Sequence, residues 1–131
     1  MTTLTWPSFF PPKCPPSKAK DASAEVFILV HSNPPSPSDF ESWAEMRPKK
    51  WMGNCEASGL SVFTAKSDAF RMVRRVQGMA KGNRALGDLI ASAKLSPEAG
   101  KLMPTPRDGN SHHTWWAPEG FDHPATFKVV T

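Results

Sequence analysis

Val26-Phe27-Ile28-Leu29-Val30-His31 is the stretch that decides the fold of this chain. Its five consecutive apolar residues, three of them β-branched, predict a strand that is buried on both faces. Ser32-Asn33-Pro34-Pro35 follows and ends the strand. Because a strand fixes the side chain at its end while the next loop leaves it accessible, His31 is a candidate functional residue. The alternative is that His31 only caps the edge of the core.

Further strands are indicated downstream of this stretch. Leu60-Ser61-Val62-Phe63 follows Gly59 and reads as a short strand. Residues 88–95 are compatible with a strand or a helix, and we favour a strand because 96–100 form a turn that leads into 101–105. Two more strands are expected, at 111–116 and at 125–130, with a loop at 118–124 between them.

Two helices are expected between the strands. The first covers about 38–46, with Phe40, Trp43 and Ala44 on one face, and Pro48 ends it. The second begins after Thr64 as its N-cap and runs to about Gln77. Its apolar stripe consists of Ala69, Val73, Val76 and Ala80. Residues 47–58 between the first helix and the next strand are expected to form a basic loop.

The order of these elements predicts a single α+β domain over 25–131, with a mixed or antiparallel sheet and two helices. Residues 1–24 are expected to form a proline-rich N-terminal arm, since nine of the 14 prolines lie in 1–48. Trp6, Phe9 and Phe10 alternate with prolines there, and we expect them to attach the arm to the domain surface. An alternative is that these aromatic residues contact another protein.

The composition excludes several classes of protein. No run of 18 apolar residues is present, so no membrane-spanning helix is expected, and the first residues lack the pattern of a signal peptide. The only two cysteines, Cys14 and Cys55, are too few for a disulfide framework. We therefore expect a cytoplasmic protein with reduced thiols, a Cys14–Cys55 bridge being the alternative.

Positive charge is concentrated in the middle of the chain. Residues 47–84 contain nine Lys or Arg against two acids, a net charge of +7, whereas the whole chain carries +4. Arg71, Arg74 and Arg75 share one face of the second helix and are candidate anion-binding residues. The partner would be a nucleotide, a nucleic acid or an acidic protein. The alternative is a helix face that is merely solvated.

Ser111-His112-His113-Thr114-Trp115-Trp116 is the most unusual local pattern. On a strand, His113 and Trp115 face one way and His112 faces the other. A histidine donor beside a tryptophan stacking surface suits a ligand site. The alternative is a buried, hydrogen-bonded histidine behind an exposed one. No spacing of histidines and cysteines is typical of zinc, so no metal site is expected.

Other motifs are weaker. The strand 60–63 carries Ser61 and Phe63 and leads into a helix N-terminus, an arrangement that can hold an anion, although strand–turn–helix packing explains it equally. No GxSxG elbow, phosphate-binding glycine loop or cysteine-protease signature is present. The acids are scattered, so a hydrolase with paired carboxylates is not supported.

Three motifs together resemble a family of small bacterial proteins without an assigned biochemical role. They are Asn33-Pro34-Pro35 followed by Asp39-Phe40-x-Ser42, then 59–64 followed by a helix, and the 111–116 strand. The resemblance covers about 26–130. It implies a shared fold and a shared site, and no activity.

The chain is also distantly similar to ADP-ribosyltransferases of the histidine type, which place a histidine at the end of an apolar first strand. The similarity implies that NAD binds between this strand and the strand 60–63. His31 would then hold the ribose, Ser61 or Phe63 would line the nicotinamide pocket, and Arg71 would lie near phosphate. The chain departs from that family in two places: the strand after His31 lacks the usual glycine, and no glutamate lies on a late strand.

The sequence therefore predicts a small bacterial accessory domain that binds an anionic ligand. One alternative is an enzyme of toxin or defence type that uses NAD, with His31 and His113 as catalytic candidates. Another is a protein-interaction subunit, and the sequence predicts no particular oligomeric state. The candidate ligand-binding residues are His31, Ser61, Phe63, His112, His113 and Trp115.

Overall fold

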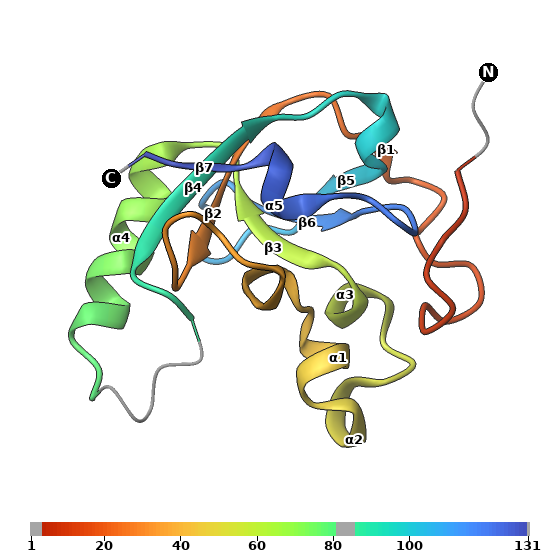
Figure 1. Ribbon diagram of the computed structural model, residues 1–131. Helices are drawn as coiled ribbons and strands as arrows, with labels where there is room; N and C mark the ends of the chain where they lie inside the picture. Colours follow the sequence, from red (N-terminus) through yellow and green to blue (C-terminus); the bar gives the residue numbers. More distant parts are fainter. Residues whose placement is uncertain (1–3, 81–85, 131) are drawn as a thin grey trace.

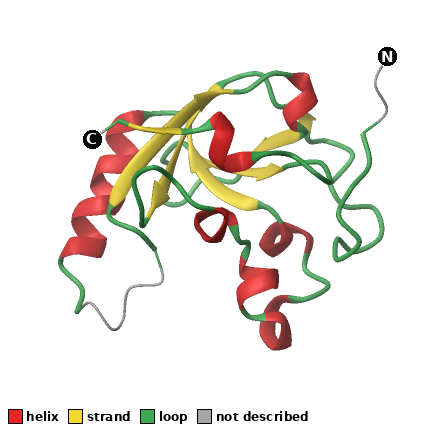
Figure 2. Ribbon diagram, viewed as in Figure 1, coloured by secondary structure: helices red, strands yellow, loops and turns green. Residues whose placement is uncertain are grey.

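A single antiparallel sheet of seven strands, in the order β1-β5-β6-β3-β2-β4-β7, organises the computed structural model, which describes residues 4–80 and 86–130. Helices and loops pack on both of its faces (Figure 1; Figure 2). The predicted α+β fold is thus confirmed, with an antiparallel sheet. The strands are β1 (Lys20–Asp21), β2 (Glu25–Val30), β3 (Leu60–Phe63), β4 (Leu89–Lys94), β5 (Lys101–Pro104), β6 (His112–Trp116) and β7 (Lys128–Val129).

The apolar strand β2 lies inside the sheet between β3 and β4, and its burial on both faces is confirmed. Val26, Ile28 and Val30 belong to the larger apolar cluster on one face. Phe27 and Leu29 point to the other face, where they pack with the long helix α4 (Lys66–Gln77). The strand at 88–95 is confirmed as β4, which pairs with β2 along its whole length.

Helix α4 is the second predicted helix, with small corrections at its ends. Its N-cap is Ala65 and not Thr64, and no side chain caps it. Ala69, Val73 and Val76 are buried against the sheet as expected, whereas Ala80 lies beyond the last helical residue and is exposed.

The first predicted helix, at 38–46, is wrong as a single element. The chain forms a short 3-10 helix η1 (Pro37–Phe40) and then a separate turn of helix α1 (Trp43–Met46). Ser42 starts the second piece because its hydroxyl accepts the Glu45 N–H, while the Glu45 carboxylate accepts the Ser42 N–H at 3.0 Å. The capping box therefore divides the predicted helix in two.

The basic segment 47–58 is also more ordered than a loop. It contains two further single-turn helices, α2 (Pro48–Trp51) and α3 (Cys55–Ser58). Pro48 occupies the first turn of α2, where a missing N–H costs nothing, and the Asn54 side chain caps α3 by accepting the Ala57 N–H. Together with α1 these helices lie below the sheet in Figure 1.

The predicted last strand, 125–130, is shorter than expected. Residues 125 and 126 belong instead to the helical turn α5 (His123–Thr126), and only Lys128–Val129 pair with β4. The side chain of Asp122 accepts the Ala125 N–H and starts the turn. Between β4 and β5 the expected turn is the short 3-10 helix η3 (Pro97–Ala99).

The N-terminal arm is part of the fold at two points. Strand β1 extends the sheet beside β5. Cys14 is bonded by a disulfide to Cys55 of α3, so the expectation of reduced thiols is wrong. The two Cα atoms are 5.5 Å apart, as is usual for a disulfide, and the arm also packs Trp6 and Phe10 onto a cluster built around Trp116. The cytoplasmic location stays a prediction.

Candidate functional site

The pairing of β3 with β6 decides which predicted site residues can meet. Phe63 lies opposite His112, and Ser61 lies opposite Thr114. Because paired residues share a face of the sheet and side chains alternate, Ser61, Phe63 and His112 lie on one face. His113, which pairs with Val62, and Trp115, which pairs with Leu60, lie on the other.

A cavity of about 380 Å³ opens on the face that carries Ser61 and His112. It lies between α1 and α4, with the sheet as its floor. Its lining includes Trp43, Ser61, Phe63, Arg75, Arg107 and His112. A smaller cavity of about 180 Å³ shares four of these residues (Trp43, Ser61, Arg107 and His112) and adds Trp51 and Glu56. We call the two together the central groove.

Ser61 shows that this part of the sheet is uncovered. It lies in the inner strand β3, whose other three residues are buried, yet Ser61 itself is exposed. An antiparallel sheet can leave part of one face open to solvent, and an exposed residue among buried neighbours marks such an opening here. The break separates α4, which covers β2 and β3 on one side, from the α1–α3 helices on the other.

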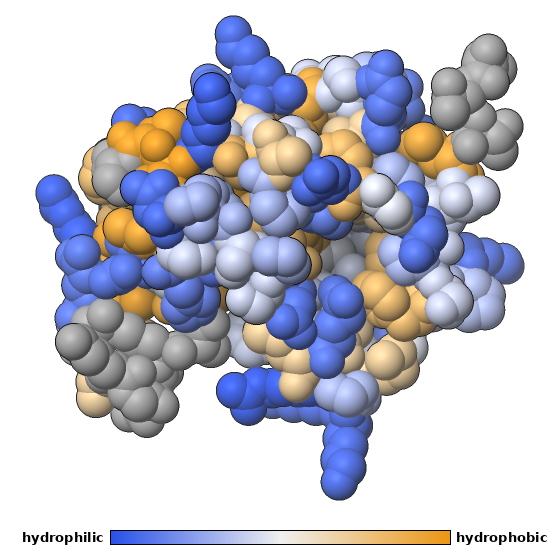
Figure 3. All heavy atoms as spheres, in the orientation of Figure 1, coloured by the Kyte–Doolittle hydropathy of each residue, from blue (hydrophilic) through white to orange (hydrophobic). Residues whose placement is uncertain are grey.

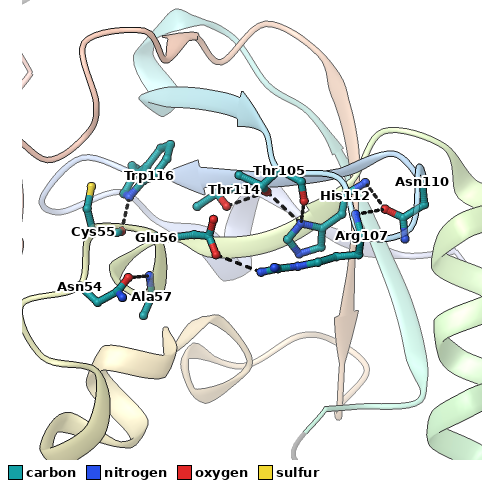
Figure 4. A network of polar contacts seen from close by, with 10 residues as sticks. All are labelled: Asn54, Cys55, Glu56, Ala57, Thr105, Arg107, Asn110, His112, Thr114 and Trp116. Atoms are coloured by element: carbon teal, nitrogen blue, oxygen red, sulfur yellow. Dashed lines mark hydrogen bonds and ion pairs between the residues drawn. The ribbon is translucent and has the colours of Figure 1, made fainter.

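His112 is held in one orientation by a polar network under the groove (Figure 4). Its Nδ1 lies 2.8 Å from the carbonyl oxygen of Thr105, which can only accept, so Nδ1 carries the proton. The Thr105 hydroxyl lies 2.9 Å from the same nitrogen and 2.9 Å from the Thr114 hydroxyl. Nε2 is therefore left as the acceptor nitrogen of a residue that lines the groove.

The charge of His112 is set by its surroundings. Burial lowers the pKa of the imidazole below its ordinary value, although the hydrogen bond to the Thr105 carbonyl opposes this, and the positive charge of Arg107 lowers it further. At neutral pH the ring is neutral. It can accept a hydrogen bond from a ligand without adding charge to the groove.

Two guanidinium groups from different elements line the groove. Arg75 comes from α4, and Arg107 comes from the loop between β5 and β6. Arg107 donates to the Glu56 carboxylate of α3 at 3.0 Å, and both partners are about half exposed. An exposed ion pair of this kind contributes little to stability, so Arg107 can exchange Glu56 for a more strongly bound anion.

The other predicted site residues lie elsewhere. His31 is exposed after β2, where its backbone N–H donates to the Asp39 carboxylate at 2.6 Å. His113 is partly buried, and Trp115 is fully buried, its indole N–H donating to the Ala99 carbonyl at 2.7 Å. These three candidate ligand-binding residues therefore do not line the central groove with Ser61.

The three arginines of α4 are divided as well. Arg75 lines the groove, whereas Arg71 is exposed and pairs with Asp68 on its own helix at 3.3 Å. Arg74 is exposed and is not among the lining residues.

Several groove residues are not among the site residues expected from the sequence, among them Trp43, Glu56 and Arg107. The sequence places Trp43 on an apolar helix face and indicates no role for Arg107. Neither residue carries a local signal, because each contributes only through the folding of distant segments onto β3 and β6. The Pro-Arg-Asp-Gly turn beside the histidine strand was the one available hint.

In comparisons with known proteins, no family model, no curated protein and no solved structure matches the chain. Across 4–80 and 86–130, no three metal-binding side chains are grouped so as to hold an ion. No helix in the same ranges is long and apolar enough to cross a membrane.

Proposed function

We propose that the protein binds a small anionic molecule with an aromatic ring, of the nucleotide type, in the central groove. The observation that carries the proposal is the convergence of Ser61, Phe63, Arg75 and His112 on one cavity. These four residues come from two strands and a helix, and the sequence had already marked each as a candidate. The cavity volume falls in the range of small-molecule sites.

The groove offers the groups that such a ligand needs. Trp43 and Phe63 provide apolar ring surface, while Arg75 and Arg107 provide charged donors for phosphate oxygens. Ser61 and the acceptor nitrogen of His112 can bind the polar edge of a base or a ribose hydroxyl. The limited size of the groove favours a small molecule over a nucleic acid or an acidic protein, which the exposed Arg71 and Arg74 would serve better.

Titration calorimetry with ADP as the probe tests this proposal. The wild-type protein should bind ADP, and Arg75→Gln should weaken binding roughly tenfold or more, because a charged hydrogen bond is lost. Arg74→Gln is the matched control, since it removes the same charge from the next position of α4 and leaves the groove intact. Absence of ADP binding, or equal losses in the two variants, would contradict the proposal.

One observation favours a second candidate, an NAD-using transferase. The resemblance to histidine-type ADP-ribosyltransferases implies that NAD lies between the strand ending at His31 and the strand that carries Ser61. In the structure these strands, β2 and β3, are paired, and Leu29, Ser61 and Phe63 line the groove beside them. The carboxylates that line the groove, those of Asp39, Glu41 and Glu56, lie on or beside short helices and not on a late strand.

Release of nicotinamide from NAD distinguishes the second candidate from the first. An enzyme should release nicotinamide, and Ser61→Ala should slow the release. A protein that binds ADP and leaves NAD intact over hours is a binding protein, and the transferase is then excluded.

A further inference from the structure

A second cavity, of about 350 Å³, lies on the other side of β3 and β6. Residues 7–10 of the arm form one wall, and the segment 117–121 with His123 of α5 forms the opposite wall. Leu60 and Trp115, which face this side of the sheet, lie at its base. In the space-filling view the surface is hollowed between α5 and the arm (Figure 3). We call this cavity the arm pocket.

Aromatic rings at right angles form two corners of the arm pocket. On the arm, Phe9 and Phe10 are 5.0 Å apart with an interplanar angle of 86°. Across the pocket, Phe121 and His123 are 5.2 Å apart at 85°. Perpendicular rings turn their faces to different directions, so such pairs can surround a compact group on several sides, as the aromatic cages of methylated ammonium sites do.

The charge of the arm pocket is opposite to that of the chain. Glu45 and Glu119 line it, and no Lys or Arg is among its lining residues, although the chain carries a net charge of +4. Burial lowers the pKa of His123, while its hydrogen bond to the Phe121 carbonyl and the nearby carboxylates of Glu45 and Asp122 oppose this. The imidazole is therefore neutral at pH 7 and does not cancel the two carboxylates.

We propose that the arm pocket binds a small organic cation with a methylated ammonium head. The ring faces of Phe9, Phe10 and Phe121 attract the head through their negative π surfaces, and a methylated nitrogen loses little hydration on entry. The carboxylates of Glu45 and Glu119 supply the matching charge. The pocket is separate from the central groove, so this inference does not depend on the proposed nucleotide site.

A pair of probes that differ only in charge tests whether the arm pocket recognises a cation. Choline has a trimethylammonium head, and 3,3-dimethyl-1-butanol has the same shape with a neutral carbon in place of nitrogen. Titration calorimetry at low salt should show choline binding at least about tenfold more tightly than the alcohol, as expected for a cation on aromatic faces. Equal affinity of the two probes, or no binding of choline at millimolar concentration, overturns the inference.

Two substitutions locate the site. Phe121→Leu keeps the apolar volume and removes a ring face, so it should weaken choline binding roughly tenfold. Glu119→Gln removes one charge from an exposed residue that the fold does not need, and should weaken binding severalfold. Glu25→Gln, on an exposed residue outside the pocket, is the matched control. Choline binding that is unchanged in both pocket variants places the cation elsewhere and overturns the inference.

Discussion

At the scale of single residues, hydrogen bonds of polar side chains fix the shape of the groove. Among the residues that the structure describes, no buried side-chain nitrogen or oxygen lacks a partner. His112 illustrates the consequence: its proton is committed to Thr105, so only one ring nitrogen is available to a ligand. The sequence could mark His112 as unusual, but its tautomer depends on Thr105, which is distant by seven residues and reaches it only across the β5–β6 pair.

His112, which is buried, and His123, which is partly buried, lead us to expect a pH dependence of stability. Burial lowers the pKa of His112 and of His123 below the ordinary 6.5, so just below that pH the unfolded chain binds more protons than the native protein. The free energy of unfolding should therefore fall as the pH drops from 7 through 6.5, and level off below the native pKa values. Urea denaturation across this range measures it, and the double variant His112→Gln/His123→Gln should give a flatter curve. An equally steep curve in the variant would assign the dependence to other groups.

Replacement of Asp39 is expected to destabilise the turn that follows β2. Its two carboxylate oxygens accept the His31 N–H at 2.6 Å, the Ser32 hydroxyl at 2.6 Å and the Ser36 N–H at 2.9 Å, and so fix the turn at the rim of the groove. Asp39→Asn replaces one acceptor by a donor that faces other donors, and should cost about 1–2 kcal/mol in chemical denaturation. Asp21→Asn, which only breaks an exposed ion pair with Lys101, should cost much less. Equal costs would show that the turn does not depend on Asp39.

At the scale of elements, the sequence predicted the strands better than the helices. Strands β2, β3, β4 and β6 each carry an apolar or alternating pattern that burial enforces. The single-turn helices α1, α2, α3 and α5 are too short for a periodic pattern, and capping side chains or an early proline start them instead. Such local signals are visible in a sequence but also occur in loops, so they could not be separated from turns.

Gly100 lies at a close approach between the start of β5 and the end of β6. It adopts φ = 109°, and a Cβ at this position would collide with the Trp116 carbonyl oxygen of the neighbouring strand. Gly109 also has a positive φ, of 77°, but open space around it. Gly100→Ala should therefore cost roughly 2 kcal/mol or more in denaturant, and Gly109→Ala about 1 kcal/mol. Similar losses in the two variants would mean that β5 and β6 can move apart at Gly100 without cost.

At the scale of the whole molecule, one sheet separates two cavities of different chemistry. The lining of the central groove on one face includes Arg75 and Arg107 beside three carboxylates, whereas the lining of the arm pocket on the other includes two carboxylates and no Lys or Arg. The sequence showed that alternate residues of the histidine strand face opposite ways. It could not show which face stays open, because this depends on where α1 and the arm pack. Half of the predicted ligand residues therefore meet in the groove, and the rest do not.

The disulfide between the arm and α3 is expected to raise the free energy of unfolding of the whole protein. Cys14 and Cys55 are separated by 41 positions, so their bond restricts a long loop of the unfolded chain. The double variant Cys14→Ser/Cys55→Ser should lose about 2–4 kcal/mol of unfolding free energy, and a reductant should have a similar effect on the wild-type protein. If a reductant leaves the wild-type denaturation curve unchanged, the arm is held by packing alone.

The most direct test of the central claim follows the indole N–H signals of the tryptophans by nuclear magnetic resonance during a titration with ADP. Trp43 lines the groove, whereas the indole of Trp115 is buried on the opposite face of the sheet and bonded to the Ala99 carbonyl. Saturable movement of the Trp43 signal, with the Trp115 signal unchanged, is the result that we predict. Movement of Trp115 while Trp43 stays still, or no movement of either signal, would contradict the assignment of the groove as the anion site.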